Sequence, residues 1–130
     1  MLFVEDSSRF RELVLRKYLQ GCDVTVLESG KRFAERLRDR NYHFILMDYQ
    51  LPGRYSGEDL VRITRGAGYD GAVVAVSSAD SLNRKLLKAG ADVALEKREH
   101  FLLPRMIRQA LSIAEARGSD IKCTFGLPTG

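Results

Sequence analysis

The chain has 130 residues, of which 45% are apolar and 29% charged, as in an ordinary globular protein. This length suits one domain with one core, and the composition excludes disordered, collagen-like and coiled-coil proteins. The formal net charge is +4, and the basic residues are spread mainly over residues 9–17, 31–40 and 84–88. We interpret these stretches as solvated helix faces, and we do not expect this domain to bind nucleic acid directly.

Neither a membrane span nor a secretory signal is expected. No apolar run approaches the roughly 18 residues that a membrane helix needs, and the chain opens directly into MLFVED without a basic segment. The two cysteines, Cys22 and Cys123, lie far apart and form no CxxC pair. This usage is typical of free thiols in a reducing cytosol, so we expect a cytoplasmic protein.

Short β-rich runs alternate with stretches of helical periodicity along the chain. The five predicted strands are 2–4, 24–27, 44–47, 73–76 and 93–95. Most are continuously apolar, which is typical of a parallel sheet covered on both faces. Alternating βα units of this length predict one open α/β sheet with helices on both sides.

The intervening stretches carry apolar residues at helical spacing. These residues are Phe10, Leu13, Val14 and Tyr18 in the first helix, Phe33 and Leu37 in the second, Leu60 and Val61 in the third, Leu82, Leu86 and Leu87 in the fourth, and Ile107, Ala110, Leu111 and Ala114 in the fifth. We predict that the third helix ends near Gly66, that Ser81 caps the fourth and Gly90 ends it, and that Pro104 lies in the first turn of the fifth. Residues 1–117 therefore form the predicted domain, and residues 118–130 a tail or the start of a linker.

Polar residues follow four of the five predicted strands. Glu5 and Asp6 follow the first strand, Asp48 the third, Ser77 and Ser78 the fourth, and Glu96 and Lys97 the fifth. An open parallel sheet binds ligands at the carboxyl ends of its strands, so we expect these groups to converge. Crowded carboxylates repel one another, and a hard divalent cation with oxygen ligands, Mg²⁺ above all, relieves that repulsion.

Asp48 is the candidate nucleophile, because it ends an apolar strand before a turn that contains Pro52 and Gly53. A carboxylate there can accept a phosphoryl group while a metal neutralises the transferring oxygens. Ser77 can donate a hydrogen bond to a phosphoryl oxygen, and Lys97 supplies a point charge. Each residue also has a purely structural interpretation. Glu5 and Asp6 can stabilise the dipole of the helix that follows, and Asp48 can simply form a turn. Ser77 can bond to the backbone, and Lys97 can be a solvated side chain.

These residues resemble the receiver domain of two-component response regulators. The resemblance runs from Met1 to about Arg117 and rests on LFVEDS, FILMDYQLPG followed by Gly57, VVAVSSAD and VALEK. It implies a doubly wound five-stranded parallel sheet flanked by five helices in the flavodoxin-like topology. It also implies that Asp48 is phosphorylated, that Ser77 and Lys97 contact the phosphoryl group, and that Mg²⁺ is held by Glu5 or Asp6, Asp48 and the backbone carbonyl of Gln50.

The implied function is that of a regulatory phosphoacceptor, not a turnover enzyme. A histidine kinase or phosphotransfer protein would supply the phosphoryl group, and a downstream protein or output domain would read the resulting change in surface.

Three positions depart from the family pattern. Arg98 replaces the proline that often follows the lysine, and Ala94 stands where the family has its aromatic switch residue. The segment GRYS between Pro52 and Gly57 is one residue longer than the commonest version. The first two departures keep open the alternative of a pseudo-receiver that binds partners without phosphorylation.

A phosphatase activity and nucleotide binding are both disfavoured by the sequence. A haloacid dehalogenase phosphatase needs a second aspartate two positions after the nucleophile, and this chain has Gln50 there. Nucleotide binding lacks its motifs, since neither GxGxxG nor GxxxxGK[ST] follows the first strand.

Overall fold

The computed structural model describes residues 1–39 and 41–119. Its five parallel strands follow the order β2-β1-β3-β4-β5. The strands are β1 (Leu2–Val4), β2 (Thr25–Leu27), β3 (Phe44–Met47), β4 (Ala72–Ser77) and β5 (Val93–Glu96). The helices are α1 (Ser8–Tyr18), α2 (Phe33–Asp39), α3 (Gly57–Gly66), α4 (Asp80–Ala89) and α5 (Leu103–Ala116), with a 3₁₀ segment η1 (Lys97–Leu102) before α5. This is the predicted doubly wound fold with five helices.

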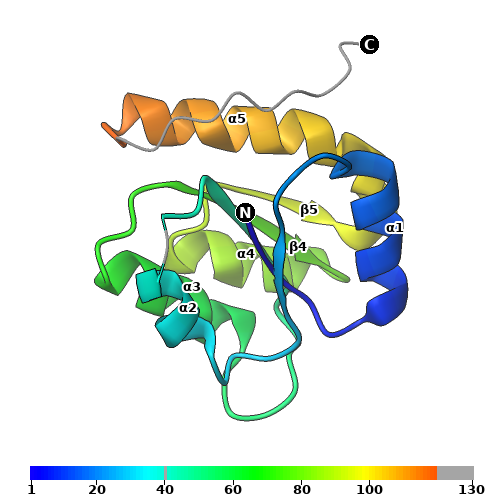
Figure 1. The fold of residues 1–130 in the computed structure, drawn as a ribbon, viewed down its shortest axis with the longest axis horizontal. Helices are drawn as coiled ribbons and strands as arrows, with labels where there is room; N and C mark the ends of the chain where they lie inside the picture. The colour runs from blue at the N-terminus through cyan, green and yellow to red at the C-terminus, as the bar shows by residue number, and fades with distance from the viewer. Residues whose placement is uncertain (40, 120–130) are drawn as a thin grey trace.

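The helices cover the sheet in two layers (Figure 1). Helices α1 and α5 lie on one face, and their core contains Val14 and Ile107 against alternate residues of the strands, such as Phe3 and Leu46. Helices α2, α3 and α4 cover the other face, with Phe33, Leu60 and Leu86 in the core. Because the central strands are buried on both sides, their sequences are continuously apolar, as in FILM of β3.

The predicted boundaries hold within a residue or two, with one cap that is wrong. Ser81 does not cap α4, because the helix begins at Asp80 after Ala79, whose methyl side chain cannot accept a capping bond. Gly90 ends α4 at a φ of 129°, as predicted, because this left-handed conformation costs glycine no Cβ clash. Strand β2 is only partly buried, and Val26 is 36% exposed at the edge of the sheet.

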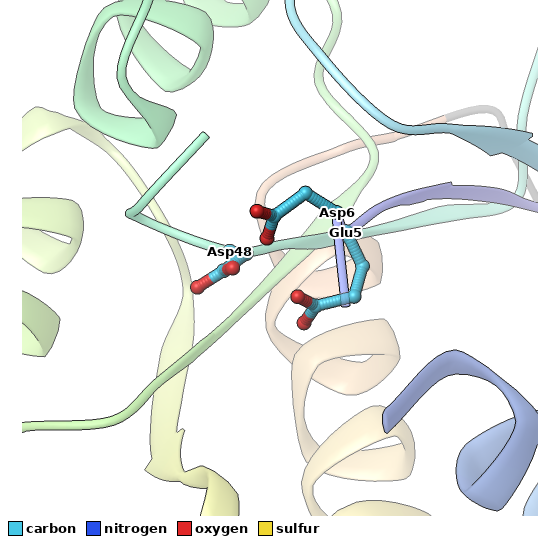
Figure 2. A group of neighbouring side chains, drawn as sticks. All are labelled: Glu5, Asp6 and Asp48. Atoms are coloured by element: carbon cyan, nitrogen blue, oxygen red, sulfur yellow. The ribbon is translucent and has the colours of Figure 1, made fainter. Parts of the chain in front are cut away.

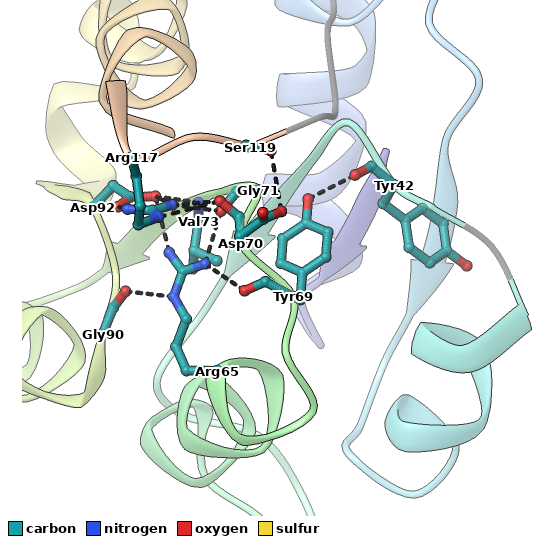
Figure 3. Close-up of polar contacts among 10 residues, drawn as sticks. All are labelled: Tyr42, Arg65, Tyr69, Asp70, Gly71, Val73, Gly90, Asp92, Arg117 and Ser119. Carbon is teal, nitrogen blue, oxygen red and sulfur yellow. Dashed lines mark hydrogen bonds and ion pairs between the residues drawn. The ribbon is translucent and has the colours of Figure 1, made fainter. Parts of the chain in front are cut away.

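A polar network joins the amino ends of β4 and β5 to α3 and α5 (Figure 3). Asp92, just before β5, accepts hydrogen bonds from the guanidinium groups of Arg65 (3.0 Å) and Arg117 (2.6 Å) and from the amide of Val73 (2.9 Å). Arg65 also donates to the carbonyl of Gly71 at 2.8 Å. We call Asp92, Arg65 and Arg117 the amino-edge cluster. It fixes the end of α5 against the sheet.

None of the described helices is long and apolar enough to cross a membrane. Cys22 is a free thiol, and burial raises its pKa. The expectation for Cys123 falls outside the described residues, as does the predicted tail beyond Ser119.

Candidate functional site

The three predicted acids meet at the carboxyl edge of the sheet (Figure 2). Strands β1 and β3 are neighbours with Val4 opposite Met47, so the residues that follow them, Glu5 and Asp48, come level. One carboxylate oxygen from each of Glu5, Asp6 and Asp48 lies within 4.8 Å of the others. The three side chains can therefore offer ligands to a single ion.

Lys97 bridges the two buried acids. Its Nζ donates to Oε2 of Glu5 at 2.9 Å and to Oδ2 of Asp48 at 3.2 Å, and it lies 5.0 Å from the centroid of the Phe10 ring. Burial acts to lower the pKa of Lys97, but its hydrogen bonds to the two carboxylates and their charges raise it on balance. Lys97 is therefore a fixed cation at the end of β5. We call Glu5, Asp6, Asp48 and Lys97 the acidic site.

Glu5 is the most confined member of the acidic site. Its side chain is fully buried, and Oε2 accepts from Lys97 and from the amide of Ser7. Burial, together with the hydrogen bond and charge of Asp48, raises the pKa of Glu5 to about 7, although Lys97 opposes the shift. Its Oε1 has no hydrogen-bond partner among the described residues. A buried carboxylate oxygen without a donor is costly, and it leaves an acceptor open to an ion or a water.

Asp48 is held from both sides. Oδ1 accepts the amide of Tyr49 at 2.7 Å, and the side chain is 3% exposed. Helix α3 begins against this loop at Gly57, whose amide donates to the carbonyl of Tyr49 at 2.8 Å. A Cβ on residue 57 would overlap the carbonyl oxygen of Asp48, so only glycine allows this approach.

Asp6 adds a third carboxylate to the two buried acids. Asp6 is exposed at the rim, and the Gln50 carbonyl accepts no hydrogen bond within the described part of the chain. The three carboxylates are oxygen donors of the kind that a small hard cation prefers. The unpartnered Oε1 of Glu5 and the excess of negative charge over the single Lys97 also fit such an ion.

Ser77 is close in the fold but does not bond to the acids. It is fully buried at the end of β4, and its hydroxyl lies 2.8 Å from both the carbonyl of Ala79 and Oδ1 of Asn83. One hydroxyl hydrogen serves only one of these acceptors at a time. Ser77 therefore faces the start of α4.

Sequence reasoning did not identify Asn83 or Tyr49 as members of the site's surroundings. Asn83 is 4% exposed on α4, although asparagine is usually a surface residue, and no pattern in the sequence distinguishes it. Tyr49 lies next to the acceptor; its hydroxyl is 3.4 Å from Glu58, and the ammonium of Lys85 is 5.6 Å from its ring centroid. The only available signal was its adjacency to Asp48.

The fold and site together define a doubly wound α/β domain with an acidic cluster and one lysine at its carboxyl edge. The model of the response regulator receiver domain matches residues 1–110, and the chain belongs to this family. It is thus a domain of two-component signalling, and such domains are regulatory phosphoacceptors and not classical enzymes.

One relative and two solved structures illustrate the similarity. Two-component response regulator ARR7 of Arabidopsis thaliana is 28% identical over 137 residues, which cover 93% of this chain and 66% of the plant protein. The chain thus spans slightly less than two thirds of that relative's length.

The receiver domain of Francisella response regulator 1452 is 25% identical with a TM-score of 0.72, covering 91% of this chain and 97% of that one. The receiver domain of sensor histidine kinase PA1611 from Pseudomonas aeruginosa has the same identity and TM-score over 85% of this chain and 95% of its own. That structure has a magnesium ion coordinated in its active site cleft.

Proposed function

We propose that this domain accepts a phosphoryl group on Asp48 and transmits its arrival by a conformational change. The observation that carries the proposal is the buried contact of Asp48 and Glu5 with Lys97 beside the exposed Asp6. Among the three acids, Asp48 has the firmest orientation, since one oxygen is held by the Tyr49 amide and the other by Lys97. An oriented carboxylate beside a fixed cation suits nucleophilic attack on phosphorus.

The proposed step is a transfer from a phosphohistidine. A carboxylate oxygen of Asp48 forms a bond to phosphorus, and the bond between phosphorus and the donor nitrogen breaks, leaving its electron pair on the imidazole. Lys97 already donates to Oδ2 of Asp48, so its ammonium is placed to donate to an oxygen of the transferring group. The product is an acyl phosphate on Asp48.

Mg²⁺ is the proposed cofactor, held by Glu5 or Asp6, Asp48 and the carbonyl of Gln50. When bound, it would neutralise negative charge on the phosphoryl oxygens. The residues of the chain position the acceptor: Glu5 holds Lys97, Lys97 orients Asp48, and Gly57 keeps the loop after β3 close to the start of α3.

The proposed donor is a histidine kinase or a phosphotransfer protein, and the proposed recipient of the signal is a downstream protein or an output domain. Membership of the family implies a kinase partner in general terms. We propose that the domain, over residues 1–117, works in the cytoplasm.

Incubation with Mg²⁺ and acetyl phosphate, followed by intact-mass measurement, tests the assignment. The parent should gain one phosphoryl group, and Asp48→Asn should gain none while keeping its fold. Asp80→Asn is a matched control, because Asp80 is an exposed aspartate of α4 whose one ion pair among the described residues is with Arg84. Labelling of Asp48→Asn at the parental level would refute the site assignment. A folded parent that stays unlabelled would favour a partner-binding pseudo-receiver, for which Ala94 and Arg98 are the motivating residues.

We propose that Ser77 carries the signal from Asp48 to α4. A hydroxyl that turns from Ala79 and Asn83 toward a phosphoryl oxygen gains a hydrogen bond to a charged acceptor, worth about 1.5–3 kcal/mol. Such a gain is enough to bias a loop with two conformers. Because Ala94 has no ring to rotate, we expect strand β5 to move little.

Amide chemical shifts with and without beryllofluoride test this route. We expect the largest changes at residues 78–83, and Ser77→Ala should remove them while leaving acetyl phosphate labelling of Asp48 in place. Changes concentrated in residues 92–96 and α5, with residues 78–83 unmoved, would refute the route.

A further inference from the structure

A second concave site lies beside the acidic site, between the loop after β2 and the loop after β3. It has a volume of about 510 Å³ and is lined by Ser29, Gly30 and Lys31 from one loop and by residues 52–55 from the other. This volume is within the range of small-molecule sites, about 300–1,000 Å³. The acidic site uses none of these residues.

The two loops that form the pocket are packed against each other. Gly30 is buried, and a Cβ on it would lie 2.8 Å from Cβ of Tyr55 and 3.1 Å from a methyl group of Leu60. The absence of a side chain at residue 30 therefore lets Tyr55 close one wall of the pocket. Ser56, the next residue, caps α3 and accepts from the Asp59 amide at 3.2 Å, which anchors this wall to a helix.

Two cations of the pocket, Lys31 and Arg54, have no acidic partner in the described part of the chain. Neither the Lys31 ammonium nor the Arg54 guanidinium forms an ion pair within residues 1–39 and 41–119. The Arg54 guanidinium lies 5.7 Å from the centroid of the Tyr55 ring. Nearby carboxylates have partners of their own, since Glu28 pairs with Arg11 and Glu58 with Arg62.

The segment GRYS, one residue longer than is usual, supplies Arg54 and Tyr55. This segment therefore contributes both a charge and a wall to the pocket, and the phosphoacceptor chemistry makes no use of either. Pro52 and Tyr55 add apolar surface next to the cations. A ligand that satisfies both features is an anion with a flat apolar body.

We propose that this pocket binds a small aromatic phosphate or carboxylate, with the anionic group between Lys31 and Arg54 and the flat ring against Pro52 and Tyr55. None of the seven lining residues of the pocket belongs to the acidic site.

Adenosine 5′-monophosphate is the probe, with inorganic phosphate and adenosine as partial ligands. Calorimetric titrations without Mg²⁺ should show binding of the monophosphate that is tighter than that of either part. Lys31→Ala/Arg54→Ala should weaken the monophosphate about tenfold or more. Arg84→Ala/Lys88→Ala removes the same charge from exposed positions of α4 and should leave the affinity unchanged.

Amide shifts of the parent protein locate the ligand without any variant. Changes at residues 29–31 and 53–55 are expected, with residues 5, 6, 48 and 97 little affected. The 5′-carboxylate of adenosine replaces the phosphate of this probe with a carboxylate. If it binds more tightly than adenosine 5′-monophosphate, the natural ligand is a carboxylate and not a phosphate. No binding at millimolar concentration, shifts centred elsewhere, or equal weakening by both double variants would each overturn the proposal, whatever the outcome of labelling at Asp48.

Discussion

Two charge clusters, each built around buried carboxylates, stand at opposite ends of the same sheet. In the amino-edge cluster, one carboxylate, Asp92, meets two guanidinium groups, and both of its oxygens have donors (Figure 3). In the acidic site, the ammonium of Lys97 pairs with two of three neighbouring carboxylates, Glu5 and Asp48, and Oε1 of Glu5 has no donor among the described residues (Figure 2). The carboxylate of the first cluster is fully paired within the described residues, whereas the second has more carboxylates than cations.

The difference separates a structural cluster from a functional one. A buried charge that is paired and fully hydrogen-bonded holds elements together, and its loss leaves its partners without compensation. A buried charge without sufficient partners costs stability until a ligand supplies them. We therefore expect the same kind of substitution to act in opposite directions at the two edges.

The largest effect is expected for Asp92→Ala. Its removal leaves Arg65 and Arg117 without their shared carboxylate and the amide of Val73 without this acceptor. The free energy of unfolding should therefore fall by about 3–5 kcal/mol. Urea denaturation measures this loss. Asp80→Ala, which removes an aspartate from an exposed pair on α4, is the control and should have little effect. A loss at Asp92 no greater than that of the control would mean that this cluster is not structural.

Gly57→Ala should damage the acidic site through the backbone. Its Cβ would overlap the carbonyl of Asp48, so the loop after β3 must shift, at a cost of about 1–3 kcal/mol. The extent of Asp48 labelling by acetyl phosphate should also fall, because the shifted loop carries Asp48. Gly66→Ala is the matched control, because a Cβ there meets no atom within 4 Å and the backbone is helical. Equal stabilities and labelling of the two variants would contradict the close approach.

Glu5→Gln should stabilise the metal-free protein at alkaline pH. The pKa of Glu5 is raised to about 7 in the folded state, so the parent loses stability as pH rises from the ordinary value of 4.5 through 7. The variant lacks this titration and should exceed the parent by about 1–3 kcal/mol at pH 8, with little difference at pH 4. Thermal unfolding in the presence of a chelator measures the stability difference at both pH values. Glu35→Gln, at an exposed position of α2, is the control. A variant less stable than the parent at pH 8 would contradict the crowding of charge.

Much of the fold followed from local patterns, because each strand and helix has its own periodicity. The continuous apolar runs FILM and VVAV predicted central strands, and they are buried. The predicted cap of α4 is wrong. Serine is a good capping residue by type, but the backbone is extended at Ala79 and becomes helical at Asp80, one residue before Ser81. The amino-edge cluster was not predicted, because it joins Arg65, Asp92 and Arg117 across distances in sequence that carry no motif.

The acidic site was predictable to the level of its residues but not of its bonds. Parallel strands bring their carboxyl ends to one edge, so the meeting of Glu5, Asp6, Asp48 and Lys97 followed from their places after the strands. That Lys97 bonds to both buried acids, and that Ser77 bonds toward Asn83, depends on side-chain conformations that tertiary packing decides.

A Mg²⁺ titration followed by amide chemical shifts tests the contrast between the two edges most directly. We expect saturable shifts at residues 5, 6, 48–50 and 97, loss of these shifts in Asp48→Asn, and no response at residues 65, 92 and 117. Saturable shifts at the amino-edge cluster, or a response in Asp48→Asn equal to that of the parent, would contradict this contrast.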